Sequence, residues 1–89
     1  MTSGRLTLTN RLGLHARAAS KLVQTASRFE SAVWLEYNGK RVNAKSIMGV
    51  LLLGAPCGAE LYVELDGPDV DHALAALQEL IENRFGEAQ

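Results

Sequence analysis

The sequence predicts an α+β fold in which one antiparallel sheet lies under a set of helices. Two observations predict it. The strand-like segments alternate apolar and polar residues, as in a sheet with one buried face, and the helix-like segments each carry one apolar stripe. The order is β-α-β-β-α-β-α, without a linker or an internal repeat. With 89 residues, 47% of them hydrophobic, residues 1–89 are expected to form a single domain with one modest core.

The first half of the chain is predicted to contain a strand, a helix and a hairpin. The segment "RLTLT" at 5–9 alternates like a half-buried strand. A helix follows Gly13, and its apolar face falls at spacings of three and four residues: Ala19, Leu22, Val23 and Ala26. In "SAVWLEYNGKRVNA" at 31–44, two strand-like runs flank Asn38-Gly39, a dipeptide that accepts the positive φ angles of a type I′ turn.

The second half is predicted to contain a short helix, a strand and a long helix. Ser46 is a suitable N-cap for the short helix, and Gly54 is a suitable stop. The segment "ELYVELD" at 60–66 alternates cleanly. After the turn "DGPD", an apolar stripe predicts a last helix from about Val70 to Phe85.

Composition limits the compartment and the class of protein. The single cysteine, Cys57, cannot form an intramolecular disulfide and does not fit a zinc-ligand spacing, so a cytoplasmic location is expected. The first ten residues lack the apolar core of a signal peptide, and no apolar run approaches membrane-spanning length. A domain of this size has room for a surface site but not for a deep substrate cavity with a separate cofactor domain, so an enzyme for a large substrate is not expected. No cofactor is expected either.

Charge is distributed unevenly, although the net charge is only −1. Residues 1–28 hold five cationic side chains and no acid, whereas residues 60–89 hold eight acids against Arg84 alone. Five cations without interleaved aromatic residues are weak support for nucleic-acid binding. They suit an acidic protein partner or a phosphate equally well.

His15, in "NRLGLHARAASKL", is the residue that most needs a functional interpretation. A lone histidine at a helix start is more often a surface or capping residue. Three local features favour a phosphate instead: unpaired N–H groups at the helix start, the backbone freedom of Gly13, and the guanidinium of Arg17. The helix start should keep the ring neutral, and no acid lies near it in the sequence to compete with a phosphoryl group. From the residues alone, phosphohistidine chemistry and a capping role remain equally supported, and no metal site is expected.

Three segments carry a resemblance over essentially the whole chain: "LGLHARAASKL", "LVQTASRFESAVWLEYNGKRVNAKSIMGV" and "GAELYVELDG". In this order and spacing they resemble the HPr family, the histidine-containing phosphocarriers of the bacterial phosphoenolpyruvate-dependent sugar phosphotransferase system. The resemblance implies an open-faced β-sandwich, with four antiparallel strands covered on one face by three helices. It also implies a monomeric carrier that relays phosphoryl groups without turnover of its own.

The resemblance implies a role for individual residues. His15 matches the histidine that is phosphorylated on Nδ1 by enzyme I and that passes the group to IIA components of sugar permeases. Arg17 matches the arginine that neutralises the phosphoryl group. Ser46 matches a serine that HPr kinase/phosphorylase phosphorylates in some bacteria. Ala18 stands where the family usually has proline. Because alanine leaves the unfolded chain more conformational freedom, this change should lower the stability of the fold by roughly 0.4–1 kcal/mol. Alanine is a good helix former, so the helix start should stay intact.

Other residues have weaker interpretations. Ser46 needs no role beyond that of an N-cap. Apolar side chains on the short helix could be tolerated singly or could form a docking surface for enzyme I and IIA. The predicted docking set consists of four residues of the short helix and two residues that follow His15 in the sequence: Ile47, Met48, Leu51, Leu52, Ala18 and Lys21. His72 is expected to be solvated, Cys57 to be an incidental thiol, and Trp34 and Tyr37 to be packing residues.

Three alternatives to a sugar-system carrier stay open. The first is the paralogous carrier of the nitrogen-related phosphotransferase branch, which would use the same chemistry with other partners. The second is a regulatory module that binds a transcription factor through phosphorylated Ser46, although such a module would not need the pairing of His15 and Arg17. The third and weakest is a small catalytic domain, because no acid or second base accompanies His15 in the sequence. Neither nucleic acid nor a membrane is an expected partner.

Overall fold

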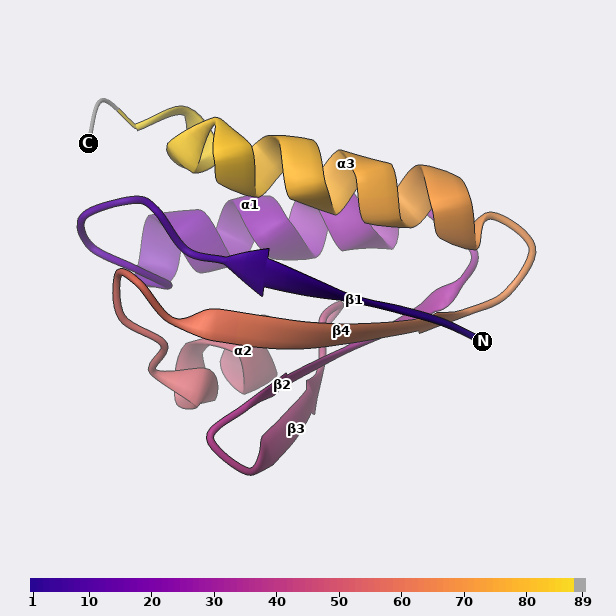
Figure 1. The fold of residues 1–89 in the computed structure, drawn as a ribbon, viewed down its shortest axis with the longest axis horizontal. Helices are drawn as coiled ribbons and strands as arrows, with labels where there is room; N and C mark the ends of the chain where they lie inside the picture. The colour runs from indigo at the N-terminus through magenta and orange to yellow at the C-terminus, as the bar shows by residue number, and fades with distance from the viewer. Residues whose placement is uncertain (88–89) are drawn as a thin grey trace.

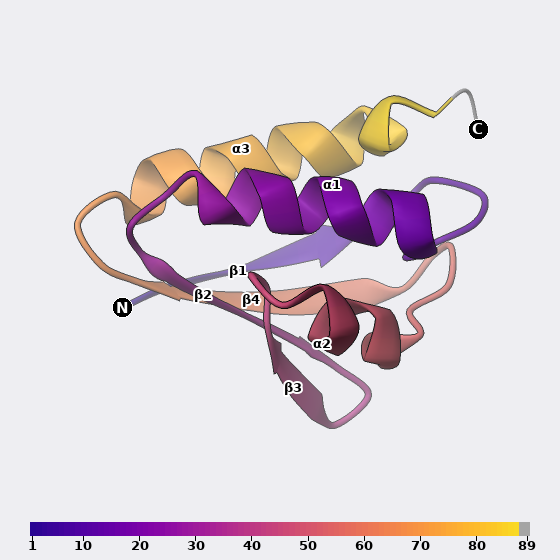
Figure 2. The same ribbon diagram turned by 180° about the vertical axis from the view of Figure 1, so that it is seen from behind.

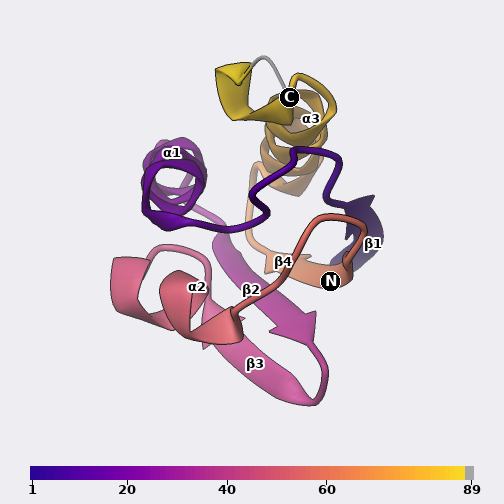
Figure 3. The ribbon, with the colours of Figure 1, turned by 90° about the vertical axis from the view of Figure 1, so that its left-hand side faces the viewer.

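The computed structural model describes residues 1–87 and consists of one sheet with helices on one side. Its elements are, in chain order, β1 (Thr2–Thr7), α1 (Ala16–Ser27), β2 (Ala32–Tyr37), β3 (Lys40–Asn43), α2 (Ile47–Leu53), β4 (Glu60–Asp66), α3 (Val70–Glu82) and the short 3₁₀ turn η1 (Arg84–Gly86). The strands pair antiparallel in the order β1-β4-β2-β3. All three helices lie on the same face, as Figures 1 and 3 show. The predicted α+β fold and element order are confirmed.

The β2–β3 hairpin turns where the sequence predicts it. Asn38 and Gly39 have φ angles of 53° and 82°, which are the left-handed conformations that a type I′ turn requires. The turn sets the register of the hairpin, in which Tyr37 lies opposite Lys40 and Trp34 lies opposite Asn43. The predicted hairpin is therefore confirmed.

The core lies between the sheet and the helices and follows the predicted periodicities. Alternate residues of β4, namely Leu61, Val63 and Leu65, are fully buried, and they meet Leu22 of α1 and Leu77 of α3 in one apolar cluster. Burying a side chain of this kind stabilises the fold by about 1.5–3 kcal/mol. The period of two in the strands and of 3.6 in the helices thus places one face of each element in the same core.

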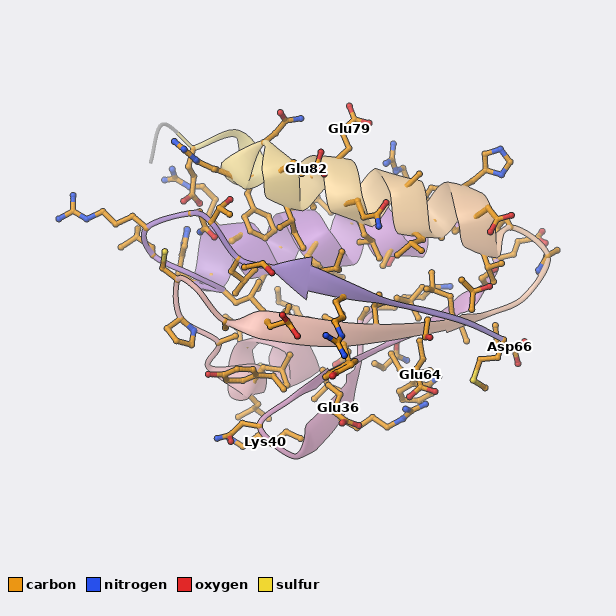
Figure 4. The ribbon with its side chains drawn as sticks, in the orientation of Figure 1. Glu36, Lys40, Glu64, Asp66, Glu79 and Glu82 are labelled. Carbon is orange, nitrogen blue, oxygen red and sulfur yellow. The ribbon has the colours of Figure 1, made fainter. Side chains whose placement is uncertain are left out.

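The other face of the sheet is open to solvent and carries polar and aromatic side chains, including the labelled Glu36 and Glu64 in Figure 4. Trp34 lies on this face, with the guanidinium carbon of Arg41 5.1 Å from its ring centroid. Tyr37 is half-buried against the core. Tyr37 is therefore a packing residue of the core, as expected, whereas Trp34 packs against Arg41 on the open face.

Helix α3 ends earlier than the sequence predicts. The predicted helix to Phe85 is too long, because α3 ends at Glu82. Arg84 and Phe85 have φ angles of 53° and 56°, which are left-handed conformations that break the helix. The Phe85 side chain is buried in this turn. Figures 1 and 2 show the turn at the same end of the molecule as the start of α1. Within residues 1–87, no helix has the length and apolar character needed to cross a membrane.

Candidate functional site at the start of α1

His15 is the N-cap of α1. Its backbone is extended, its carbonyl accepts from Ala19 N at 2.8 Å, and its Nδ1 accepts from Arg17 N at 3.3 Å. A side chain that accepts a backbone N–H in this way satisfies one of the unpaired donors of the helix start. The predicted position of His15 at the helix N-terminus is confirmed, and the side chain does the capping.

The loop before His15 is seated on the segment that follows α2. Gly13 has a φ of 63°, and a Cβ atom built on it would lie 2.4 Å from the carbonyl oxygen of Ala55. Leu14 N donates to the same oxygen at 2.9 Å. The position therefore requires glycine both for its conformation and for the close approach, and the seat fixes where His15 enters α1.

A carboxylate contacts the imidazole, contrary to the expectation from the sequence. Glu87 Oε2 lies 2.5 Å from His15 Nε2, and the two side chains expose 13% and 26% of their surface. The expectation rested on sequence neighbours, whereas these two residues are 72 positions apart. The carboxylate meets Nε2 and not Nδ1, so it lies on the opposite side of the ring from the helix start.

These two contacts assign the ring proton. Nδ1 accepts a hydrogen bond and therefore presents a lone pair, while Nε2 faces a carboxylate and therefore carries the proton. Burial on its own raises the pKa of Glu87, but the hydrogen bonds from His15 and Asn10 and the charge of Arg17 oppose it, and the pKa of Glu87 lies below the usual value. Glu87 is thus ionised at neutral pH.

The turn after α3 is fastened beside the histidine. Lys21 is half-buried, and its ammonium group donates to the carbonyl of Phe85 at 2.5 Å. Asn10 Nδ2 donates to Glu87 Oε1 at 3.2 Å. Lys21, which the sequence analysis places in the docking set, thus uses its charged group to bind the chain's own C-terminal turn.

Arg17 and Ala18 differ in what they can offer a partner or a phosphate. Arg17 is exposed on the first turn of α1, as predicted. Ala18 has 0% exposure, because the third position of α1 faces the core. The inclusion of Ala18 in a docking surface is therefore corrected, since its side chain is not accessible.

Part of α2 faces solvent. Met48 and Leu52 expose 64% and 66% of their surface, and Ile47 exposes 39%. We refer to Ile47, Met48 and Leu52 as the α2 surface. Leu51 is only half-buried, and the inward side of α2 is made by Val50 and Leu53. Ile47, a member of the predicted docking set, lies on this exposed side.

Ser46 is exposed and caps α2, with its Oγ accepting from Gly49 N at 3.2 Å. The predicted N-cap is confirmed. His72 and Cys57 are both exposed, as expected.

Two residues of the site were missed by sequence reasoning, namely Glu87 and Asn10. The one signal that points to Glu87 is the uneven charge, since an acidic C-terminal third complements a basic N-terminal segment. That signal does not select one acid. Glu79, which points away from the sheet in Figure 4, and Glu82 both lie on α3, whereas Glu87 follows the turn and contacts the histidine.

Comparison with known proteins places the chain in a family. A family model described as "PTS HPr component phosphorylation site" matches residues 2–83. The chain is 56% identical to the phosphocarrier protein HPr of Xylella fastidiosa strain Temecula1, over 98% of both chains. A crystal structure of HPr from Thermoanaerobacter tengcongensis matches this chain with a TM-score of 0.95 and 45% sequence identity over 100% of both chains. A crystal structure of an HPr dimer from the same organism matches with a TM-score of 0.78 and 46% identity, over 98% of this chain and 100% of the dimer's chain. The chain therefore belongs to the HPr family of phosphocarrier proteins.

Proposed function

We propose that this protein accepts a phosphoryl group on Nδ1 of His15 from phosphorylated enzyme I and passes it to IIA components of sugar permeases. The observation that carries the proposal is the assignment of the two ring nitrogens. Nδ1 presents its lone pair at the helix start, and Nε2 holds its proton against Glu87. A neutral imidazole in this tautomer is a nucleophile at Nδ1.

Transfer to His15 exchanges one nitrogen–phosphorus bond for another. The lone pair of Nδ1 forms the new bond, the bond between phosphorus and the donor's imidazole breaks, and the donor nitrogen keeps that electron pair. Arg17 N, which now donates to Nδ1 at 3.3 Å, is released to donate to a phosphoryl oxygen. The N–H groups of the first turn of α1 and the exposed guanidinium of Arg17 stabilise the negative charge.

Glu87 contributes on the far side of the ring. As Nδ1 bonds to phosphorus, the ring becomes more positive, and a carboxylate at Nε2 stabilises that charge. The phosphoryl group is itself anionic, so the nearby carboxylate also limits how strongly the site retains it. Both effects suit a carrier that must hold the group and then release it.

The partners dock beside His15 on the α2 surface. The close seating of Gly13 and Leu14 on Ala55 brings the end of α2 next to the loop that carries His15. Ile47, Met48 and Leu52 then supply an apolar surface that a partner can bury, and Met48 can adapt its shape to different partners. The phosphoryl group reaches the partner's histidine without entering a cavity. A monomeric state in the cytoplasm remains our expectation.

Ser46 gives this surface a means of regulation. Its hydroxyl is exposed at the start of α2, immediately before Ile47 and Met48. A phosphate there would sit at a helix N-terminus, which tolerates negative charge, so the fold would be preserved. The added charge would oppose docking of a partner that buries the α2 surface. HPr kinase/phosphorylase is the enzyme class that would add it.

The proposal is tested by incubating the protein with enzyme I and phosphoenolpyruvate and measuring its intact mass. We expect a gain of one acid-labile phosphoryl group, lost in His15→Ala and retained in His72→Ala, which removes the other, exposed histidine. No gain in the wild type with a competent enzyme I, or an equal gain in His15→Ala, would contradict the proposal.

A further inference from the structure

Asn10 is a fully buried polar residue in the loop between β1 and α1. Its exposure is 0%, and within residues 1–87 the only other buried polar or charged residue is Ser31. Ser31 is matched by Asp69, which accepts from its hydroxyl at 2.5 Å. Asn10 lies at the other end of the molecule, five positions before His15. A buried amide is costly unless it is hydrogen-bonded, so its partners indicate what it is for.

The amide of Asn10 works only as a donor. Nδ2 donates to the carbonyl oxygen of Gly13 at 2.7 Å and to Glu87 Oε1 at 3.2 Å. Both partners are acceptors, which fixes the orientation of the amide. Oδ1 has no hydrogen-bond partner among residues 1–87. One NH₂ group therefore ties the loop that leads to His15 to the carboxylate that contacts His15.

Glu87 is consequently held at both of its oxygens. Oε1 accepts from Asn10, and Oε2 lies 2.5 Å from Nε2 of His15. A glutamate side chain held at one oxygen can rotate about its torsions, whereas one held at both has a single orientation. Lys21 fastens the backbone two residues earlier, at the carbonyl of Phe85, but it does not touch the carboxylate.

We propose that Asn10 is a positioning residue for phosphoryl transfer: it aims the carboxylate of Glu87 at Nε2 of His15 and so keeps the lone pair on Nδ1. The inference rests on the proposed function and adds a residue to it. A neutral histidine exchanges its proton between two tautomers, and only the tautomer with the proton on Nε2 can attack phosphorus through Nδ1. The rate of phosphorylation therefore falls in proportion to the population of that tautomer.

The test measures the tautomer directly, by the ¹⁵N chemical shifts of the His15 ring at a pH where the ring is neutral. The variants are Asn10→Ala, which removes the donor, and Asn10→Asp, which keeps the shape but places a carboxylate against Glu87. Both should shift the ring toward a mixture of tautomers. Phosphorylation by enzyme I should slow by the same factor as the loss of the Nε2–H tautomer. Unchanged ring shifts in both folded variants would overturn the proposal.

A double-mutant cycle separates positioning from a purely structural role of the bond to Gly13. In the Glu87→Ala background, Asn10→Ala should cause no further change in tautomer or in rate, because Asn10 acts through Glu87. An equally large change in that background would show that Asn10 acts through the loop instead, and would overturn the proposal. If the wild type is not phosphorylated at all, the proposed function fails, whereas the tautomer measurement still decides the role of Asn10.

A second measurement needs no substitution at Asn10. The side-chain amide protons of Asn10 should exchange with solvent more slowly in the wild type than in Glu87→Ala, in which one of their two acceptors is missing. The matched control is Glu82→Ala, which removes an exposed glutamate at the end of α3 and should leave the exchange unchanged. Equal exchange rates in the wild type and Glu87→Ala would contradict the inferred contact.

Discussion

At the scale of single residues, His15 is defined by its two nitrogens. The backbone N–H of Arg17 at the helix start donates to Nδ1, and the side-chain carboxylate of Glu87 contacts Nε2. The absence of an acid near His15 in the sequence suggested that an acid would interfere with phosphoryl transfer. In the structure an acid does contact the ring, but at Nε2 and not at Nδ1. A carboxylate at Nε2 fixes the proton there and leaves Nδ1 available.

Gly13 provides a test of how the histidine loop is seated. Gly13→Ala should destabilise the protein for two reasons, a left-handed backbone and a Cβ atom 2.4 Å from Ala55 O. The matched control is Gly39→Ala in the β2–β3 turn, where φ is 82° and no atom lies within 4 Å of the added Cβ. The control should cost roughly 1–2 kcal/mol.

We expect Gly13→Ala to cost about 1–3 kcal/mol more than Gly39→Ala, because the clash with backbone atoms adds to the conformational strain. Urea denaturation of the two variants measures the free energies of unfolding. Equal losses in the two variants would show that the loop does not depend on its close approach to Ala55.

At the scale of elements, local patterns predicted most of the fold. The period of two in β4, the Asn38-Gly39 turn and the caps of α2 are all properties of neighbouring residues, and all are confirmed. The predicted end of α3 was wrong because Phe85 continues the apolar stripe of this helix in the sequence, although α3 ends at Glu82. It reaches the core instead through two left-handed residues, Arg84 and Phe85 itself, neither of which is glycine.

Helix α2 allows the two roles of Ser46 to be separated. Aspartate and asparagine both cap helices about as well as serine, so Ser46→Asp and Ser46→Asn should keep the stability of the wild type, while Ser46→Ala should lose about 1 kcal/mol. Only Ser46→Asp adds a negative charge beside the α2 surface. We expect enzyme I to phosphorylate His15 more slowly in Ser46→Asp and at the wild-type rate in Ser46→Asn. Equal rates in these two variants would remove the regulatory role.

At the scale of the whole molecule, the contacts that complete the site join the two ends of the chain. Asn10, Lys21 and His15 lie in the first quarter of the sequence, and their partners lie at 85–87. No local periodicity reports such contacts, which is why the sequence identified His15 and Arg17 but not Glu87 or Asn10. The same limit applies to Ala18, whose burial follows from the packing of α1 on the other elements.

A second long-range contact predicts how stability depends on pH. Asp69 accepts from the hydroxyl of Ser31 and from the backbone N–H groups of Glu30 and Ser31, which joins the start of β2 to the start of α3. These hydrogen bonds hold the pKa of Asp69 below its ordinary value of 3.8, and the bond from the Ser31 hydroxyl has the largest effect. A lowered carboxyl pKa contributes stability above pH 3.8, and this stability is lost as the pH falls through the folded-state pKa.

Ser31→Ala should therefore be less stable than the wild type at neutral pH, and the difference should shrink as the pH falls below 3.8. Urea midpoints measured from neutral to acidic pH give the comparison. Ser27→Ala, on the exposed side of α1, serves as a control whose effect should not depend on pH. A difference between Ser31→Ala and the wild type that stays constant with pH would contradict the role of Asp69.

The central claim is that His15 carries the phosphoryl group on Nδ1, with its other nitrogen held by Glu87. The most direct test is a ¹⁵N spectrum with phosphorus coupling, recorded on protein phosphorylated by enzyme I and phosphoenolpyruvate. We predict that phosphorus is coupled to Nδ1 of a single histidine, and that the signal is absent in His15→Ala. Coupling to Nε2 of His15, or to the ring of His72, would contradict the account.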